Sequence, residues 1–252
     1  MKIITQSSGL FLLLIIAPTL ACDFPPSLWC SSLEIAKTCN VETQCKQYSY
    51  TPASPVNLAL YFESECNACK TFIAEQLYKT WKELGSDILN ITIVPYGNAK
   101  EKKWFGKWEY TCQHGQDECA GNLIETCAMY IMQNFSNYFP FIHCIEAQKW
   151  TAPADAAKTC AKNMKIDLAP ITDCANGKLG NGLLHEMALK TAALNPPHMY
   201  VPWITFNGQH DGILENRALS DLLSVVCDMY KGPKPTACSK LYKTADRCYK
   251  NP

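Results

Sequence analysis

The chain has 252 residues, with 23 basic residues against 23 acidic ones and a formal net charge of zero. Charged residues make up 18% of the sequence, below the roughly 25% of an average soluble protein. A chain without surplus positive charge is not expected to bind nucleic acid or an anionic membrane surface.

The first residues have the pattern of a secretory signal peptide. Lys2 gives a short basic region, Leu10–Ala17 is an apolar run, and Thr19 and Ala21 place small residues before a cut after Ala21. The apolar run is too short to cross a bilayer, which takes about 20 residues. We predict a signal peptide over residues 1–21 and a product with no membrane span; a retained anchor is the alternative.

Export changes how the 15 cysteines are interpreted, because most cysteines pair in an oxidising compartment. Asn90-Ile-Thr92 and Asn134-Phe-Ser136 are acceptor motifs for N-glycosylation. We predict that Asn90 and Asn134 are glycosylated in the secretory pathway.

Residues 22–50 form a cysteine-rich segment, with four cysteines in "CDFPPSLWCSSLEIAKTCNVETQC" (residues 22–45). So short a segment cannot build its own core and needs disulfides to hold it. Its cysteine spacing and "PPSLWC" resemble a saposin A-type segment. A lipid-binding saposin uses a longer helical bundle, so we interpret this segment as a stapled appendage and do not expect it to bind lipid.

A βαβ unit follows the linker "TPASP" at residues 51–55. Residues 56–62 form an apolar run of strand length, apolar residues then recur at helical spacing over 69–84, and residues 88–94 give a second strand. The two strands are expected to be parallel, with a right-handed crossover.

The middle of the chain, about residues 98–198, is mostly helical in pattern and carries "CQHGQDECAGNLIETC" at residues 112–127. On one helix, Cys119 and Cys127 would lie about 12 Å apart along the axis. Disulfide partners need Cα atoms within about 7 Å, so these two cysteines should pair elsewhere. Residues 201–209 then predict a strand closed by an Asn207-Gly208 turn, and residues 218–230 a last amphipathic helix.

The motif Cys66-Asn67-Ala68-Cys69, between the first strand and its helix, is the strongest candidate for chemistry. Backbone N–H groups and the helix dipole favour a thiolate on the first cysteine, and the second lies on the same helical face. Ionised Glu63 and Glu65 would oppose that thiolate, whereas Lys70 would favour it.

Three interpretations of the motif compete. A redox pair is favoured by its place after a strand. A structural disulfide without activity is the second. The third is half of a zinc site, for which Cys112 and His114 are the nearest further ligands.

Three stretches, "NITIVPYGNA", "CQHGQDECAGNLIETC" and "PPHMYVPWITFNG", resemble the gamma-interferon-inducible lysosomal thiol reductase (GILT) family. The resemblance spans about residues 55–248. It implies an α/β, thioredoxin-like domain over residues 55–232 with a disulfide-rich helical insertion at about 98–198. It also implies reduction of protein disulfides in acidic endosomal or lysosomal compartments, with Cys66 as nucleophile and Cys69 as resolving cysteine. Asn67-Ala68 replaces the two glycines of vertebrate members, which leaves the motif intact.

The same resemblance matches Pro202 to the cis-proline that faces the active cysteines in thioredoxin-like folds. A cis bond would leave the Val201 backbone free to bind an extended substrate strand. An ordinary trans proline at the start of a strand is the alternative that the residues alone favour.

The remaining histidines and several tryptophans receive no catalytic assignment. His114 lies inside the signature, where a hydrogen-bonding role at a helix end and a catalytic role are both open. The others form no metal-ligand spacing, or are expected to pack; they are His143, His185, His198, His210, Trp104, Trp108 and Trp150.

The sequence therefore predicts a thiol:disulfide oxidoreductase acting mainly as a reductase. Its partners would be disulfide-bonded proteins and a small-thiol or protein reductant, with no cofactor and no metal. A secreted disulfide isomerase and a non-catalytic secreted binding protein are the alternatives. The location is expected to be the secretory pathway, with the product lysosomal, endosomal or secreted.

Cysteines outside the appendage and the Cys-x-x-Cys motif number nine, an odd set. An odd set implies a free thiol or an intermolecular bond, so a disulfide-linked homodimer is a further expectation. Residues 233–252, which hold Cys238 and Cys248, are interpreted as a tail and possible propeptide.

Overall fold

The computed structural model describes residues 22, 29–30, 33–45 and 53–243. The chain divides into two compact units, residues 1–49 and 50–252. In the first unit, α1 (Leu33–Thr38) and α2 (Glu42–Cys45) are joined to the rest of the appendage by the disulfides Cys22–Cys39 and Cys30–Cys45. The four cysteines of the appendage therefore pair among themselves.

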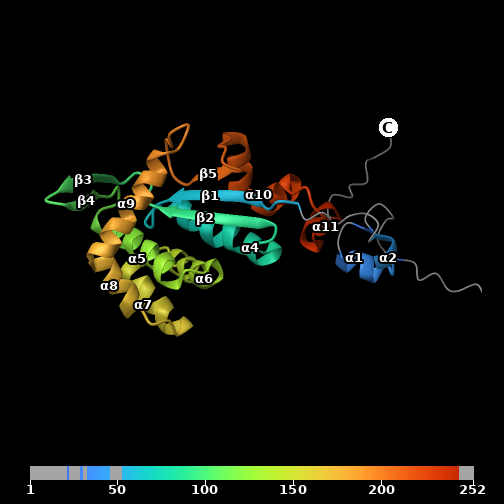
Figure 1. Cartoon of the computed structure of the whole chain (residues 1–252), viewed down its shortest axis with the longest axis horizontal. Coiled ribbons are helices and arrows are strands. Elements are labelled where there is room, and N and C mark those ends of the chain that lie inside the picture. Colours follow the sequence, from blue (N-terminus) through green and yellow to red (C-terminus); the bar gives the residue numbers. More distant parts are fainter. Residues whose placement is uncertain (1–21, 23–28, 31–32, 46–52, 244–252) are drawn as a thin grey trace, which may run out of the picture. The chain divides into compact units, whose positions relative to one another are not determined.

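The second unit is built on a three-stranded sheet with the order β2-β1-β5 (Figure 1). The strands are β1 (Val56–Phe62), β2 (Leu89–Pro95) and β5 (Trp203–Phe206). β1 is parallel to β2 and antiparallel to β5, with Leu60 paired to Ile93 on one side and to Ile204 on the other. All three of these side chains are fully buried, so the central strand lies in the core of the unit.

One continuous helical segment connects the two parallel strands, as the periodicity predicts. It consists of α3 (Asn67–Phe72), a π-helical turn η2 (Ile73–Leu77) and α4 (Tyr78–Leu84). Gln76 in the π-helical turn accepts a hydrogen bond from the Leu222 N–H at 3.2 Å and donates to the Ser220 carbonyl at 3.1 Å. These contacts bind the backbone on either side of Asp221, where α10 (Gly212–Met229) has non-helical dihedral angles.

A long insertion separates β2 from β5, and its helical part lies beside the end of the sheet toward which β1 and β2 point (Figure 1). Its helices are α5 (Gln116–Met132), α6 (Phe135–Glu146), α7 (Pro153–Met164), α8 (Ala169–Asn176) and α9 (Lys178–Ala192). Its disulfides are Cys112–Cys119, Cys127–Cys174 and Cys144–Cys160. Cys119 and Cys127 thus pair elsewhere, as the helical spacing predicts.

The beginning of the insertion differs from the expected helical pattern. Residues 100–111 form an antiparallel hairpin of β3 (Lys100–Trp104) and β4 (Lys107–Thr111). The sequence did not indicate it because charged residues fill β3, without the apolar alternation of a half-buried strand. In addition to its pairing with β3, the main chain of Trp108 forms two hydrogen bonds with the side chain of Asn181 in α9, with N–O distances of 3.0 and 2.7 Å.

The C-terminal part confirms the predicted turn and corrects the predicted last helix. Asn207 and Gly208 have φ angles of 50° and 80°, and Phe206 and Gln209 exchange both backbone hydrogen bonds across them. A further helix, α11 (Thr236–Lys243), follows α10. The disulfide Cys227–Cys238 joins the two helices.

The predicted tail, residues 233–252, is therefore joined to α10 through Cys238. A cleavage before Cys238 would leave the released segment attached through this disulfide. Cys248 lies outside the described residues. Among the described helices, the structure contains none that combines the length and the apolar character needed to cross a membrane.

Candidate active site

The two cysteines of the Cys-x-x-Cys motif lie at the junction of β1 and α3. Cys66 takes the N-cap position of α3, with φ −75° and ψ 114°, and its carbonyl oxygen accepts a hydrogen bond from the Lys70 N–H at 3.0 Å. Cys66 is partly exposed and Cys69 is fully buried, and both thiols are free of disulfide bonds. The motif thus presents one accessible thiol and one enclosed thiol, a helical turn apart.

The surroundings of the two thiols shift their pKa values in opposite directions. A hydrogen bond from the Cys69 thiol lowers the pKa of Cys66 to about 6, against the opposing effect of burial, and the backbone N–H groups of Cys69 and Ala68 add to the lowering. Burial, followed by the same hydrogen bond, raises the pKa of Cys69 well above its ordinary value. At pH 5, a thiol with a pKa of about 6 is about one-tenth thiolate, against roughly 0.03% for an ordinary cysteine.

The Val201–Pro202 peptide bond is cis and lies next to this pair. The Cys66 Sγ is 3.7 Å from the carbonyl oxygen of Val201. Pro202 is buried and leads directly into β5. The backbone at Val201 is therefore within contact distance of the accessible sulfur, whereas the roles of Val201 and Pro202 with a substrate remain predictions.

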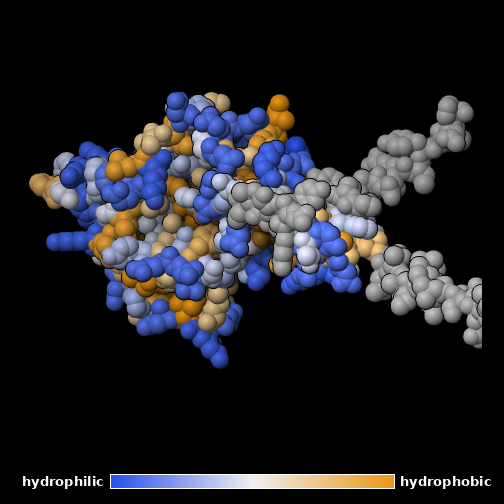
Figure 2. Space-filling view, turned by 45° about the vertical axis from the view of Figure 1, so that its right-hand side comes forward, coloured by the Kyte–Doolittle hydropathy of each residue, from blue (hydrophilic) through white to orange (hydrophobic). Residues whose placement is uncertain are grey.

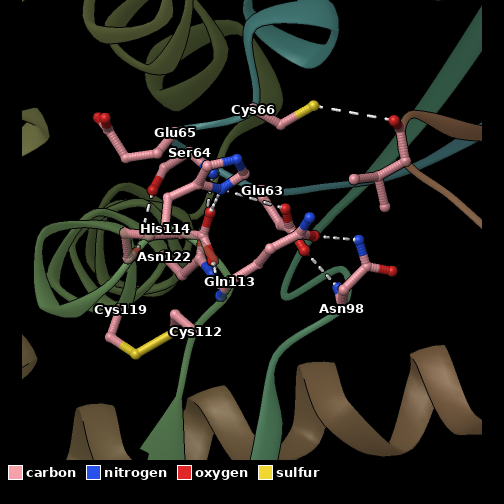
Figure 3. A network of polar contacts seen from close by, with 12 residues as sticks. Glu63, Ser64, Glu65, Cys66, Asn98, Cys112, Gln113, His114, Cys119 and Asn122 are labelled. Atoms are coloured by element: carbon pink, nitrogen blue, oxygen red, sulfur yellow. Dashed lines mark hydrogen bonds and ion pairs between the residues drawn. A yellow bond between two sulfur atoms is a disulfide. The ribbon is translucent and has the colours of Figure 1, made fainter.

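The signature residues of the insertion converge on the loop that carries Cys66 (Figure 3). His114 contacts the Glu118 carboxylate through its Nδ1, which is also 3.6 Å from the Oε2 of Glu63. The Gln113 N–H donates to the other Glu118 oxygen at 2.8 Å, and the Asn98 N–H donates to the Oε1 of Glu63. Both carboxylates are fully buried, whereas the His114 ring is 41% exposed, so His114 joins the two buried carboxylates to the surface.

Burial is the main reason that the pKa of Glu63 rises to about 7. The hydrogen bond from Asn98 opposes this shift, and the negative charge of Glu118 adds to it. The hydrogen bond to Glu118 raises the pKa of His114 above its ordinary value. As the pH falls through about 7, Glu63 gains a proton while His114, whose pKa is raised, holds its own, so the charge of the network near Cys66 becomes more positive.

Helix α5 packs directly against the loop between β1 and α3. The Ser64 N–H donates to the Asn122 side chain at 3.0 Å, and the Ser64 hydroxyl donates to the Glu118 carbonyl, also at 3.0 Å. A Cβ atom at Gly121 would lie only 2.2 Å from the Ser64 Oγ. Sequence reasoning did not assign roles to Glu118, Gly121 and Asn122, although all three lie inside the "CQHGQDECAGN" stretch that carried the family resemblance.

A second group of buried charges lies behind the motif. Lys70 is 1% exposed, and its Nζ is 3.2 Å from the Oε1 of Glu65, so their charges offset each other. Glu125 and Glu146 are fully buried, and burial raises the pKa of both carboxyls. The proximity of the two carboxyls also disfavours ionisation of both, so the pair holds a proton at acid and neutral pH.

The other predicted residues lie apart from this site or hold ordinary contacts. His185 binds the Glu101 carboxylate at 2.8 Å, and His210 binds the Ile204 carbonyl at 3.0 Å. His143 stacks on Tyr78, with ring centroids 3.7 Å apart. Burial lowers the pKa of His198.

The proposed zinc half-site is wrong in one of its ligands, because Cys112 is bonded to Cys119. Among the described residues, the one group with a spacing suited to a metal ion is Glu63, His114 and Glu118. Glu118 already accepts from Gln113 and contacts His114, and Glu63 accepts from Asn98. This group is therefore engaged as a hydrogen-bonding network around the loop of Cys66.

Both predicted glycosylation sites are exposed. Asn90 lies in β2 and donates to the Asn57 side chain at 2.7 Å. Asn134 is the N-cap of α6, where its side chain accepts from the Ser136 N–H at 2.9 Å. Both asparagines are accessible, and glycosylation at either one stays a prediction.

Comparisons of the sequence and of the structure with known proteins identify the family and the fold. Residues 57–164 match the family model described as gamma interferon inducible lysosomal thiol reductase (GILT), and residues 19–51 match a saposin A-type domain. The chain is 43% identical to the gamma-interferon-inducible lysosomal thiol reductase of Carassius auratus, over 91% of this chain and 89% of that protein. The protein of the same name from Mus musculus is 37% identical, over 89% of each chain.

A solved structure of DsbA from Chlamydia trachomatis superposes with a TM-score of 0.50 and 13% identity, over 78% of this chain and 91% of that one. This likeness confirms the predicted thioredoxin-like fold. The disulfides and the relatives fit a protein of the secretory pathway, lysosomal or secreted. The chain belongs to the gamma-interferon-inducible lysosomal thiol reductase family and is a thiol-disulfide oxidoreductase.

Proposed function

We propose that the chain reduces disulfide bonds in protein substrates through Cys66 and Cys69. The observation that supports this most strongly is the contrast between the two thiols. Cys66 is accessible and its pKa falls to about 6, whereas Cys69 is buried and its pKa rises well above the ordinary value. Nucleophilic attack requires a thiolate that a substrate can reach, and only Cys66 meets both conditions.

The reaction follows from these two states. The Cys66 thiolate attacks one sulfur of the substrate disulfide, and the other substrate sulfur leaves as a thiolate and takes up a proton. Cys69 then loses its proton and attacks the Cys66 sulfur of the mixed disulfide, which releases the second substrate thiol. The substrate gains two electrons and two protons, and the enzyme is left with a Cys66–Cys69 disulfide.

A small thiol or a protein reductant must return the two electrons before the next cycle. The 3.7 Å contact between the Cys66 Sγ and the Val201 carbonyl supports a role for the Val201 backbone, beside Pro202, in binding an extended substrate segment next to Cys66. An extended segment has unpaired backbone groups of its own. The proposed substrates are therefore proteins whose disulfides lie in unfolded or exposed stretches.

An acidic compartment is the proposed place of action, either endosomal or lysosomal. The names of the relatives from fish and mouse include the word lysosomal. Protonation of Glu63 and His114 at low pH makes the surroundings of Cys66 more positive, which favours the thiolate where an ordinary cysteine would be almost fully protonated.

We further propose the processing that the sequence predicts. A signal peptide over residues 1–21 would be removed, Asn90 and Asn134 would carry glycans, and residues 233–252 would form a tail. The described disulfides leave Cys248 as the odd cysteine of the set. It would link two chains, and a precursor that runs as a monomer on a non-reducing gel would contradict that link.

The function is tested by the reduction of a denatured, disulfide-bonded protein at pH 4.5 and pH 7, with the Cys66→Ser variant as control. Wild-type protein should keep reductase activity at pH 4.5, where an ordinary cysteine is almost fully protonated, and Cys66→Ser should be inactive at both pH values. Activity only near pH 7 would favour the isomerase alternative. Equal activity of the variant would show that the Cys-x-x-Cys motif is not the reactive centre.

A further inference from the structure

The turn of the β3–β4 hairpin presents two large aromatic side chains to solvent. Phe105 is 94% exposed and Trp104 is 51% exposed. Phe105 and Gly106 form the turn, with φ angles of 44° and 81°. Asparagine, aspartate and glycine are the usual residues at such positions, and a bulky aromatic is rare there, so local folding preference does not explain a phenylalanine at this point.

Positive charge surrounds these aromatic residues. Four lysines of the hairpin are exposed, against two glutamates in the same twelve residues: Lys100, Lys102, Lys103 and Lys107. One of the glutamates, Glu101, binds His185 at 2.8 Å. Within the part of the chain that the structure describes, none of the four lysines forms an ion pair. Lys102 lies over the Trp104 ring, with its Nζ 5.2 Å from the centroid.

The hairpin is fixed at its base, so its exposed tip is not the result of a loose loop. The Tyr110 hydroxyl donates to the Asn181 carbonyl at 2.6 Å, and the Asn181 side chain pairs with the main chain of Trp108. The disulfide Cys112–Cys119 joins the end of β4 to α5. Figure 1 shows the hairpin extending away from the sheet, and Figure 2 shows an apolar projection on that side of the molecule with hydrophilic side chains beside it.

We propose that the β3–β4 tip docks on membranes that contain anionic phospholipids. Trp104 and Phe105 would enter the boundary between headgroups and acyl chains, where aromatic residues are favoured. The lysines on both strands would then lie at the level of the anionic headgroups, which attract basic residues close to the surface.

A membrane fits this tip better than an acidic protein partner does. A stable protein interface buries about 800 Å² on each partner, which a convex two-residue turn does not offer. A fluid lipid surface closes around a small convex tip without a matching pocket. The neutral net charge of the chain gave no reason to expect an anionic membrane surface as partner, but a net charge averages over a locally basic hairpin.

Docking would also place the dithiol site near the membrane surface. The two ends of the hairpin lead into Asn98 and His114, both of which belong to the network around Glu63. A strand of five residues spans roughly 17 Å. This consequence is separate from the chemistry at Cys66, so the docking proposal does not depend on the proposed function.

Vesicle sedimentation with the full chain tests the proposal. The vesicles are phosphatidylcholine alone, and equal parts of phosphatidylcholine and phosphatidylglycerol. We expect binding to the anionic vesicles to be at least about fivefold stronger than to neutral ones, and to weaken as salt is added. The intrinsic fluorescence of the six tryptophans, Trp104 among them, should shift to the blue on binding.

Two variants separate the contributions of the aromatic and basic residues. Phe105→Asn suits the positive φ and should keep the hairpin folded, yet bind anionic vesicles about fivefold less well. Lys102→Gln with Lys103→Gln should remove most of the preference for anionic lipid. The charge-matched control, Lys82→Gln with Lys158→Gln, changes two exposed lysines elsewhere and should bind like wild type.

Reduction of a soluble substrate is the check on folding, and it should be unchanged in both double-lysine variants and in Phe105→Asn. Wild-type protein that sediments with neither vesicle would overturn the proposal. Equal binding of Phe105→Asn and wild type would overturn it as well. Retention on an acidic polypeptide without vesicle binding would show that the hairpin binds protein and not lipid.

Discussion

The charge on Glu63 changes in the pH range where Cys66 must ionise. Its pKa of about 7 means that the carboxyl is mostly protonated in an acidic compartment and half ionised near neutrality. An ionised Glu63 opposes the Cys66 thiolate, and a protonated one does not. The site therefore becomes more favourable to the thiolate as the pH falls, which partly offsets the protonation of Cys66 itself.

Replacing Glu63 with glutamine tests this coupling. Glu63→Gln keeps the side chain's shape and removes its charge, so the pKa of Cys66, followed by thiolate absorbance or alkylation rate, should fall when measured between pH 6 and 8. The ratio of kcat/KM at pH 7 to that at pH 5 should rise by less than about twofold, because Glu63 is already mostly protonated at pH 5 and Cys66 is already mostly thiolate at pH 7.

Glu75→Gln is the matched control, because this carboxylate is 52% exposed on the helix that follows the motif. It should leave both the pKa of Cys66 and the rate ratio unchanged. If the pH dependence of kcat/KM and the pKa of Cys66 were the same in Glu63→Gln and wild type, Glu63 would have no effect on the ionisation of Cys66.

Helix α5 packs so closely against the loop before α3 that there is no room for a side chain at Gly121. A Cβ atom there meets the Ser64 hydroxyl, so Gly121→Ala must displace either α5 or the loop that carries Cys66. We expect a loss of about 1–3 kcal/mol in the free energy of unfolding, the usual range for overpacking. Reductase activity should also fall in the protein that remains folded.

Gly182→Ala in α9 is the control for this prediction. No heavy atom lies within 4 Å of a Cβ at Gly182, so the change should stabilise the helix by about 0.5–1 kcal/mol and leave activity intact. Urea unfolding and the reductase assay measure both effects. Full activity and unchanged stability of Gly121→Ala would show that the helix does not position the active loop.

The βαβ unit could be predicted from sequence because its signals are local. Residues 56–62 were predicted as a strand and form β1, and the predicted strand 88–94 differs from β2 by one residue at each end. The Cys-x-x-Cys motif could be found for the same reason, since a strand, two cysteines and a helix follow one another directly.

The polar partners of the site could not be assigned in this way, because their contacts are distant in the sequence. Glu118 and Asn122 are polar residues of a helix, which usually face water, yet both are fully buried against Ser64 and its neighbours. The β3–β4 hairpin was missed in part for a related reason. The main chain of Trp108 in β4 is hydrogen-bonded to Asn181 in α9, a residue 73 positions away in the sequence.

For the whole molecule, the buried carboxyls make the free energy of unfolding depend on pH. Burial raises the pKa of Glu125 and Glu146 above that of an unfolded glutamate, so the folded state binds more protons. Their contribution is fully present below the unfolded pKa of about 4.5 and is lost as the pH rises toward the folded value. We expect wild-type protein to lose stability between pH 5 and pH 8.

Glu125→Gln should reduce that loss, by up to about 1.4 kcal/mol for each pH unit over which the group titrates. The amide cannot ionise, and it can donate a hydrogen bond to Glu146. Thermal unfolding at pH 5 and pH 8 measures the difference, and Glu83→Gln on the surface of α4 should behave like wild type. An identical pH dependence in Glu125→Gln and wild type would contradict this origin of acid stability.

In the proposed reaction Cys66 attacks the substrate and Cys69 releases it, and trapping of mixed disulfides distinguishes these two roles. Each variant, Cys69→Ser and Cys66→Ser, is incubated with a denatured disulfide-bonded protein, quenched with acid and run on a non-reducing gel. Cys69→Ser should accumulate covalent complexes that dissolve on adding reductant, because Cys66 can attack but nothing releases the substrate. Cys66→Ser should form almost none, because the remaining thiol is buried and protonated. Equal trapping by both variants, or full reductase activity in either one, would contradict the account.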